Sequence, residues 1–181
     1  YLGTVPAEIS QLMQQYQVLS YRVFMLEQKE GSYQHSQQTY PALSLATIST
    51  HDMPTLIGYW QGHDLDLRHQ LNLFPSAEIA EQLTQLRVTE KQLMQQVLHL
   101  KEGDYHQLIR ASHLYVASAP ASLMAFQLED LLHMHTPVNI PGTSQEYPNW
   151  KRRLSDELEQ LFQRQDIREL ITEIRQCRSA A

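Results

Sequence analysis

Cysteine, glycine and positive charge are all scarce in this sequence of 181 residues. Its single cysteine, Cys177, excludes an internal disulfide bond and fits a reducing compartment. With 6 glycines in the whole chain, we expect no glycine-rich backbone cradle for phosphate, and no nucleophile elbow of the Gly-x-Ser-x-Gly kind is present. The net charge of −6 argues against a nucleic-acid partner, because nucleic-acid surfaces need concentrated lysine and arginine.

Long apolar runs are absent as well. No stretch approaches the roughly 20 apolar residues that a transmembrane helix needs, and no secretory signal pattern opens the chain. We therefore expect a cytoplasmic protein without a membrane partner. The hydrophobic fraction of 42% and the charged fraction of 19% are typical of a globular chain, and the length suits one domain or a piece of one.

Three short apolar runs predict strands that are buried on both faces, as in parallel sheets covered by helices. They cover residues 21–27, 43–49 and 122–127. Helical spacing of apolar residues predicts the other elements, with Thr4, Thr89, Asp104 and Asp166 as N-caps. The expected helices are residues 4–16, two helices from Ser76 to Leu100 that meet near Val88, residues 105–117, and helices that begin at Trp150 and Ile167.

Two segments predict loops. Residues 28–40 are polar and aperiodic, and residues 135–149 contain three prolines and a glycine, which forbid regular structure. Strands that alternate with helices indicate an α/β fold with a parallel sheet. Three strands are too few for so many helices, so the sequence predicts an incomplete sheet in a helix-rich chain.

Polar side chains follow each predicted strand, at the edge where parallel α/β folds place their sites. They are Glu27 after the first strand, His51 and Asp52 after the second, and Gln127, Glu129 and Asp130 after the third. The doublet of His51 and Asp52 is also compatible with a solvated turn, since Pro54 follows almost at once.

A metal site is an alternative for the histidines, because the chain has nine of them and His133 lies close to His135. Zinc or iron requires several histidine and carboxylate ligands on rigid elements with defined spacing, and that spacing is missing. The sequence therefore predicts no metal and no cofactor.

Five segments occur in an order that resembles the C-terminal part of the bacterial amylomaltases, the 4-alpha-glucanotransferases of maltodextrin metabolism. They are LGTVP (2–6), YRVFMLE (21–27), STHDMPTLIGYW (49–60), LEDLL (128–132) and PVNIPGTSQEYPNWKRRL (137–154). The resemblance implies that residues 1–181 are one segment of a catalytic (β/α)₈ TIM barrel, and that its three strands are barrel strands six to eight.

The resemblance also implies a retaining mechanism, in which a carboxylate nucleophile forms a glycosyl-enzyme that the hydroxyl of another sugar resolves. The family's nucleophile on strand four would lie outside this chain, and its acid/base glutamate would fall one position before Tyr1. We expect the 181-residue chain alone to be inactive and, with raw strand edges, to self-associate.

By the same resemblance, Asp52 is the carboxylate that stabilises the transition state by binding sugar hydroxyls. His51, Asn139, Asn149 and Trp150 would bind the substrate, a maltooligosaccharide or α-1,4-glucan. Tyr59 and Trp60 are expected either to stack on glucose or to lie in the core. The rival hypothesis is a non-catalytic carbohydrate-binding or interaction module that uses the same scaffold.

Overall fold

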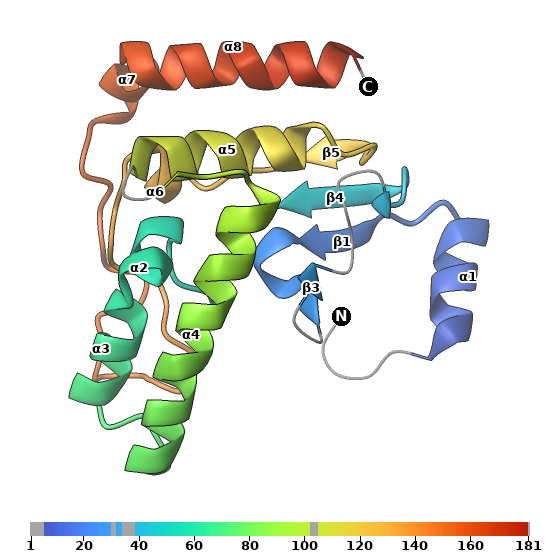
Figure 1. Ribbon diagram of the computed structural model, residues 1–181. Helices are drawn as coiled ribbons and strands as arrows, with labels where there is room; N and C mark the ends of the chain where they lie inside the picture. The colour runs from blue at the N-terminus through green and yellow to red at the C-terminus, as the bar shows by residue number, and fades with distance from the viewer. Residues whose placement is uncertain (1–5, 30–31, 34–38, 102–104, 181) are drawn as a thin grey trace.

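A three-stranded parallel sheet lies at the centre of the computed structural model, which describes residues 6–29, 32–33, 39–101 and 105–180 (Figure 1). Its strands are β1 (Ser20–Val23), β4 (Ser44–Thr47) and β5 (Leu123–Met124), in the order β1-β4-β5. Both pairings are parallel, with Val23 opposite Thr47 and Ala46 opposite Met124. The predicted parallel α/β arrangement is confirmed, although each strand is shorter than its apolar run.

The first strand ends earlier than predicted, at Val23, and the next two apolar side chains, Phe24 and Met25, are both buried. Phe24 and Met25 belong to one cluster of core residues. The chain forms a 3-10 turn there, η1 (Phe24–Leu26), in which the Phe24 ring stacks on Tyr33 at 4.9 Å between centroids. The loop predicted for residues 28–40 contains a short antiparallel pair, β2 (Gln28–Lys29) and β3 (Ser32–Tyr33).

Eight helices surround the sheet in the described part of the chain. They are α1 (Ala7–Gln15), α2 (Leu56–Gln61), α3 (His63–Gln70), α4 (Ala77–Val97), α5 (Tyr105–Ala117), α6 (Leu128–Leu131), α7 (Leu158–Leu161) and α8 (Gln165–Ala180). The prediction for α5 is confirmed over its whole length. The predicted caps Thr4 and Asp104 lie outside the described residues.

The predicted break near Val88 is wrong, since α4 is one continuous helix of 21 residues. Tertiary contacts explain the difference. Arg87 makes two hydrogen bonds of 2.8 Å to the Asp64 carboxylate of α3, and Tyr59 of α2 donates to Glu90 at 2.6 Å. Because residues 87 and 90 share one face of α4, these contacts hold the helix intact through the Thr89 capping pattern.

The helix predicted from Trp150 is also wrong. Trp150 has a φ of 61°, in the left-handed region, and its N–H donates to the carbonyl of Val138 at 2.9 Å. The last helix exists but begins at Gln165 rather than Ile167, with Asp166 inside its first turn. The predicted loop over residues 135–149 is confirmed, as it contains no helix or strand.

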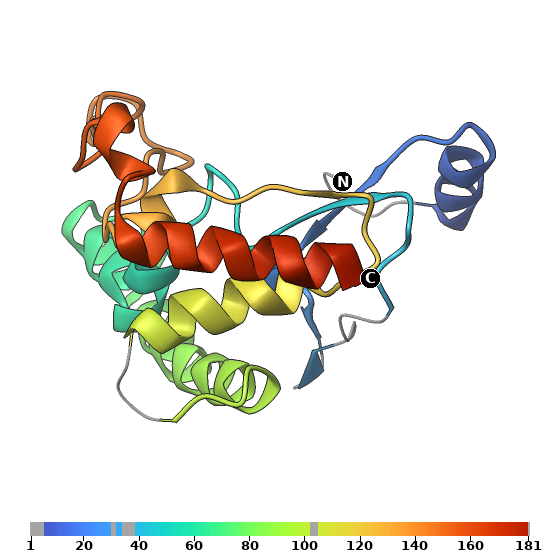
Figure 2. The same ribbon diagram turned by 90° about the horizontal axis from the view of Figure 1, so that it is seen from above.

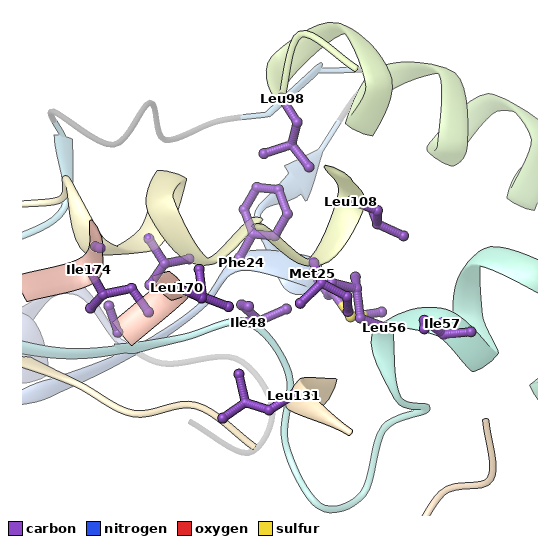
Figure 3. Packing of buried hydrophobic residues seen from close by; sticks show 14 of the residues in the cluster. Phe24, Met25, Ile48, Leu56, Ile57, Leu98, Leu108, Leu131, Leu170 and Ile174 are labelled. Carbon is purple, nitrogen blue, oxygen red and sulfur yellow. The ribbon is translucent and has the colours of Figure 1, made fainter. Parts of the chain in front are cut away.

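The core lies where the sheet meets the long helices. Helices α5 and α8 run side by side along the sheet, and α1 stands apart near the end where β1 and β4 begin (Figures 1 and 2). Figure 3 shows side chains from η1, the end of β4, α2, α5, α6 and α8 gathering in one cluster. The labelled members are Phe24, Met25, Ile48, Leu56, Ile57, Leu98, Leu108, Leu131, Leu170 and Ile174.

Gly58 marks a close approach between α2 and the chain that follows α6. A Cβ atom at this position would lie 2.3 Å from the backbone oxygen of His135 and 2.9 Å from the Thr55 hydroxyl. A backbone carbonyl cannot rotate away as a flexible side chain can, so only glycine lets these two segments meet.

We expect Gly58→Ala to lower the free energy of unfolding by about 1–3 kcal/mol, because overpacking outweighs the gain in helix propensity. Gly62→Ala is the comparison, since nothing lies within 4 Å of a Cβ there and only its φ of 80° opposes the change. Urea unfolding of both variants measures the difference. A Gly58→Ala variant at least as stable as the parent would contradict the close approach.

The carboxylate of Asp130 is buried in this core with 1% exposure. Burial raises the pKa of Asp130 to about 7, the N–H of Leu56 opposes that rise, and the charge of Glu129 adds to it. The folded chain therefore keeps a proton that the unfolded chain releases from about pH 4 upward.

The unfolding free energy should consequently fall as the pH rises through this interval, by on the order of 1 kcal/mol per pH unit from this group alone. Asp130→Asn removes that contribution. Denaturant titrations of both proteins between pH 4.5 and 8 measure this contribution as the difference between their unfolding free energies. The free energy of Asp130→Asn should rise relative to that of the parent as the pH increases. Parallel curves would show that the Asp130 carboxyl titrates normally.

Candidate functional site

The candidate site lies in the turn that follows β4 and carries His51 and Asp52. The N–H of Met53 donates to the carbonyl of Thr50 at 3.0 Å, which folds this turn tightly. The side chains of His51 and Asp52 remain 59% and 49% exposed, and His51 Nε2 lies 3.3 Å from Asp52 Oδ2. The doublet is therefore accessible to a ligand although the strand before it is buried.

The carboxylate of Asp52 is held by a second segment. Asn139, in the proline-rich loop, donates from Nδ2 to Asp52 Oδ1 at 2.7 Å. One carboxylate oxygen thus accepts from an amide while the other faces an imidazole. These contacts restrict the rotation of the Asp52 side chain, so its lone pairs have a defined direction before any ligand binds.

Trp150 extends the site with an aromatic surface. Its ring lies 5.3 Å from the His51 ring between centroids, at an interplanar angle of 47°, and its side chain is exposed. A bulky residue at positive φ is strained by about 1–3 kcal/mol and persists only where its surroundings hold it. The loop therefore presents a large ring beside the His51 imidazole.

Asn149 is placed differently from the other expected site residues. Its Oδ1 accepts from the N–H of Ile140 at 2.9 Å, and its Nδ2 donates to the carbonyl and the hydroxyl of Thr143 at 3.1 and 2.8 Å. These bonds use the side-chain amide to close the proline-rich loop on itself. Asn149 thus directly precedes Trp150 and braces the loop that carries it.

Sequence reasoning missed further braces of this loop. The Tyr147 hydroxyl donates to the carbonyl of Pro137 at 2.6 Å, and the Thr143 hydroxyl donates to the carbonyl of Ile140 at 2.7 Å. Each bond is short-range, but nothing in the sequence fixes which hydroxyl meets which carbonyl in a segment without periodicity. From the sequence, only the prolines indicate that this loop is stiff.

The structure separates the remaining polar residues at the strand ends from Asp52. Glu27 lies 3.9 Å from Arg22, and Glu129 pairs with Arg152 at 3.3 Å. Asp130 points into the core, where its Oδ1 accepts from the N–H of Leu56 at 2.7 Å. The side chain of Gln127 accepts from the Ser49 hydroxyl at 2.5 Å. The strand ends do share one edge, and the doublet is far more exposed there than Glu27 and Glu129, whose side chains are 11% and 21% exposed.

Tyr59 and Trp60, the other aromatic candidates, belong to α2. Tyr59 is buried, and the guanidinium of Arg87 lies 3.7 Å from the centre of its ring. Trp60 packs against the core cluster. Both residues therefore follow the core alternative of the sequence analysis rather than stacking at the site.

No group of three or more His, Cys, Asp or Glu side chains in the described residues is arranged to hold a metal ion. No helix in that part of the chain is long and apolar enough to cross a bilayer. What the site offers is an oriented carboxylate, an imidazole and an exposed indole ring. Such groups can bind hydroxyls in fixed directions and stack on the apolar face of a sugar ring.

Comparison with known proteins agrees with this chemistry. The sequence profile described as 4-alpha-glucanotransferase matches residues 1–159. The 4-alpha-glucanotransferase of Haemophilus influenzae is 34% identical over an alignment of 191 residues, which covers 98% of this chain and 27% of that protein. The enzyme of the same name from Mycobacterium tuberculosis is 31% identical over 113 residues, which cover 59% of this chain and 16% of its own length.

Two solved structures have the same fold over nearly the whole chain. The amylomaltase of Corynebacterium glutamicum superposes with a TM-score of 0.77 at 22% identity, over 98% of this chain and 28% of its own. The amylomaltase of Streptococcus agalactiae, solved in complex with acarbose, superposes with a TM-score of 0.63 at 14% identity, over 96% of this chain and 30% of its own. The chain thus spans about a quarter of the first relative's length. Because the family profile covers most of its residues, the chain belongs to the 4-alpha-glucanotransferase family.

Proposed function

We propose that residues 1–181 form the C-terminal part of the (β/α)₈ barrel of a 4-alpha-glucanotransferase, with β1, β4 and β5 as barrel strands six to eight. The parallel pairing of these strands supports the assignment, as does the superposition on about 28% of a solved amylomaltase. β1 lies at an edge of the sheet, and its residue Tyr21 is exposed. The preceding strand of the longer protein would cover that edge, and the isolated chain should self-associate through it.

The proposed reaction transfers α-1,4-glucan segments between maltooligosaccharides with retention of configuration. Segments outside these 181 residues would supply the nucleophile and the general acid/base. Asp52 would bind ring hydroxyls of the sugar at the cleaved bond, in contacts that strengthen as the ring flattens toward an oxocarbenium ion. The observation that carries the proposal is the exposed Asp52 carboxylate, oriented by the 2.7 Å bond from Asn139.

The other site residues would shape the sugar subsite around Asp52. His51 would donate to a hydroxyl of the same sugar, and Trp150 would stack on a glucose face. Asn139 would bind substrate with the part of its amide that Asp52 leaves free. Asn149 would act through the loop, because its amide is already bonded to Ile140 and Thr143.

Asp52→Asn in the longer protein should lower the rate of maltotriose disproportionation about a hundredfold or more, because a preorganised charged group at the transition state is lost. Release of glucose and growth of longer products measure the rate. Asp66→Asn on α3, an equally conservative change at an exposed carboxylate, should leave it unchanged.

The isolated 181-residue chain should show no turnover in the same assay. Glucan transfer by that chain alone, or full activity of the Asp52→Asn enzyme, would overturn the proposal. Sugar binding without turnover in the longer protein would favour the non-catalytic carbohydrate-binding module.

Stacking at Trp150 can be followed optically, as the sugar-induced change in tryptophan emission that is present in the parent and lost in Trp150→Phe. Addition of maltoheptaose should change the emission of Trp150 in the longer protein, because a sugar would cover an indole that is 62% exposed. Trp150→Ala should raise KM by roughly tenfold, in line with the loss of one stacking contact of about 1 kcal/mol or more. An unchanged KM together with unchanged emission would remove Trp150 from the subsite.

A further inference from the structure

Both ends of the turn that carries His51 and Asp52 are tied to α6, one to its N-cap residue Gln127 and the other to Asp130 within it. At the near end, the Ser49 hydroxyl donates to Gln127 Oε1 at 2.5 Å. At the far end, the N–H of Leu56 donates to Asp130 Oδ1 at 2.7 Å. A segment more than seventy positions away in sequence therefore fixes where the turn leaves the sheet and where it enters α2.

Folding stability alone does not explain an aspartate at this buried position. Asp130 is 1% exposed, its Oδ2 has no hydrogen-bond partner in the described part of the chain, and its neighbour Leu131 belongs to the apolar cluster. A buried carboxylate with one hydrogen-bond partner lowers folding stability, and a protein with a neutral side chain of similar shape in its place is often no less stable. Above its raised pKa the carboxylate is charged, and the benefit of that charge lies in the strength and direction of the bond to Leu56.

We propose that Asp130 is a positioning residue for the reaction. It holds the turn that carries His51 and Asp52 in the position from which the Asp52 carboxylate binds the sugar. This inference rests on the proposed function. Only three residues lie between Asp52 and Leu56, and one of them, Pro54, stiffens the connection. A shift of Leu56 is therefore passed on to the carboxylate, and a misplacement of about 1 Å can reduce a rate about a hundredfold.

The bond itself can be tested without any activity. Amide hydrogen exchange of the 181-residue chain at pH 8 reports on the Leu56 N–H in the parent and in Asp130→Asn, whose neutral oxygen accepts less strongly. We expect exchange at Leu56 and in the turn before it to become about fivefold faster. Glu129→Gln, the same kind of change one residue away, should leave these amides as they are. An unchanged Leu56 amide in Asp130→Asn overturns the proposal.

The consequence for catalysis is tested in the longer protein with maltotriose. Asp130→Asn should lower kcat roughly tenfold with a smaller change in KM, while its thermal midpoint at pH 8 stays equal or rises, because a buried charge has been removed. A residue with only a structural role would not separate activity from stability in this direction. A kcat loss that accompanies a lower midpoint, or no kcat loss despite faster exchange, counts against positioning.

The two proposals fail in different ways. If the parent protein transfers no glucan, the proposed function fails, and the role of Asp130 in that reaction fails with it. Exchange at Leu56 would still show whether the bond to Asp130 holds the turn. If the parent is active and Asp52→Asn is not, an Asp130→Asn enzyme with parental kcat overturns the positioning role alone.

Discussion

The parallel pairing of β4 between β1 and β5 is the constraint on which the rest of the structure depends. Parallel neighbours bring the carboxyl ends of their strands to one edge, so whatever follows β4 must emerge next to whatever follows β5. The turn of His51 and Asp52 and the segment from Gln127 to Asp130 meet for this reason. The bonds from Ser49 to Gln127 and from Leu56 to Asp130 then convert that proximity into a fixed geometry.

Hydrogen bonding keeps the long irregular loop in one conformation. A segment without helix or strand has no ladder to satisfy its backbone groups, and side chains must supply the partners. Asn149 does so with both ends of its amide, and Tyr147 and Thr143 contribute their hydroxyls. The loop is thereby rigid enough to hold a tryptophan in a strained backbone conformation, and to keep the amide of Asn139 against Asp52.

The sequence predicted the parallel sheet because buried strands read as short apolar runs, and it predicted the meeting of polar groups at one sheet edge because parallel topology dictates it. It could not predict where each strand ends. Phe24 and Met25 looked like strand residues, yet the chain forms the 3-10 turn η1 there. The supposed break in α4 failed because Arg87 found a carboxylate on another helix, which no local pattern encodes.

The roles of individual site residues could not be predicted from the sequence either. Trp150 resembled the start of a helix, since the residues after it are good helix formers, and only the loop geometry assigns it a positive φ. Asp130 and Glu129 are neighbours with the same chemistry in the sequence. One is buried against Leu56 and the other pairs with Arg152, and that difference arises from the direction each side chain takes on a single turn of helix.

The hydrogen bonds within the loop of residues 137–149 have a consequence for the evolution of the site. The indole of Trp150 is supported by bonds within residues 137–149, whereas the carboxylate of Asp52 is supported by the sheet and by the segment after β5. Apart from the Asn139 bond and the contact of His51 with Trp150, the two supports are independent. Under the proposed function, substitutions in the loop that spare Asn139 would alter the length or shape of the glucan accepted while the Asp52 carboxylate stays in place, so preference and chemistry can evolve separately.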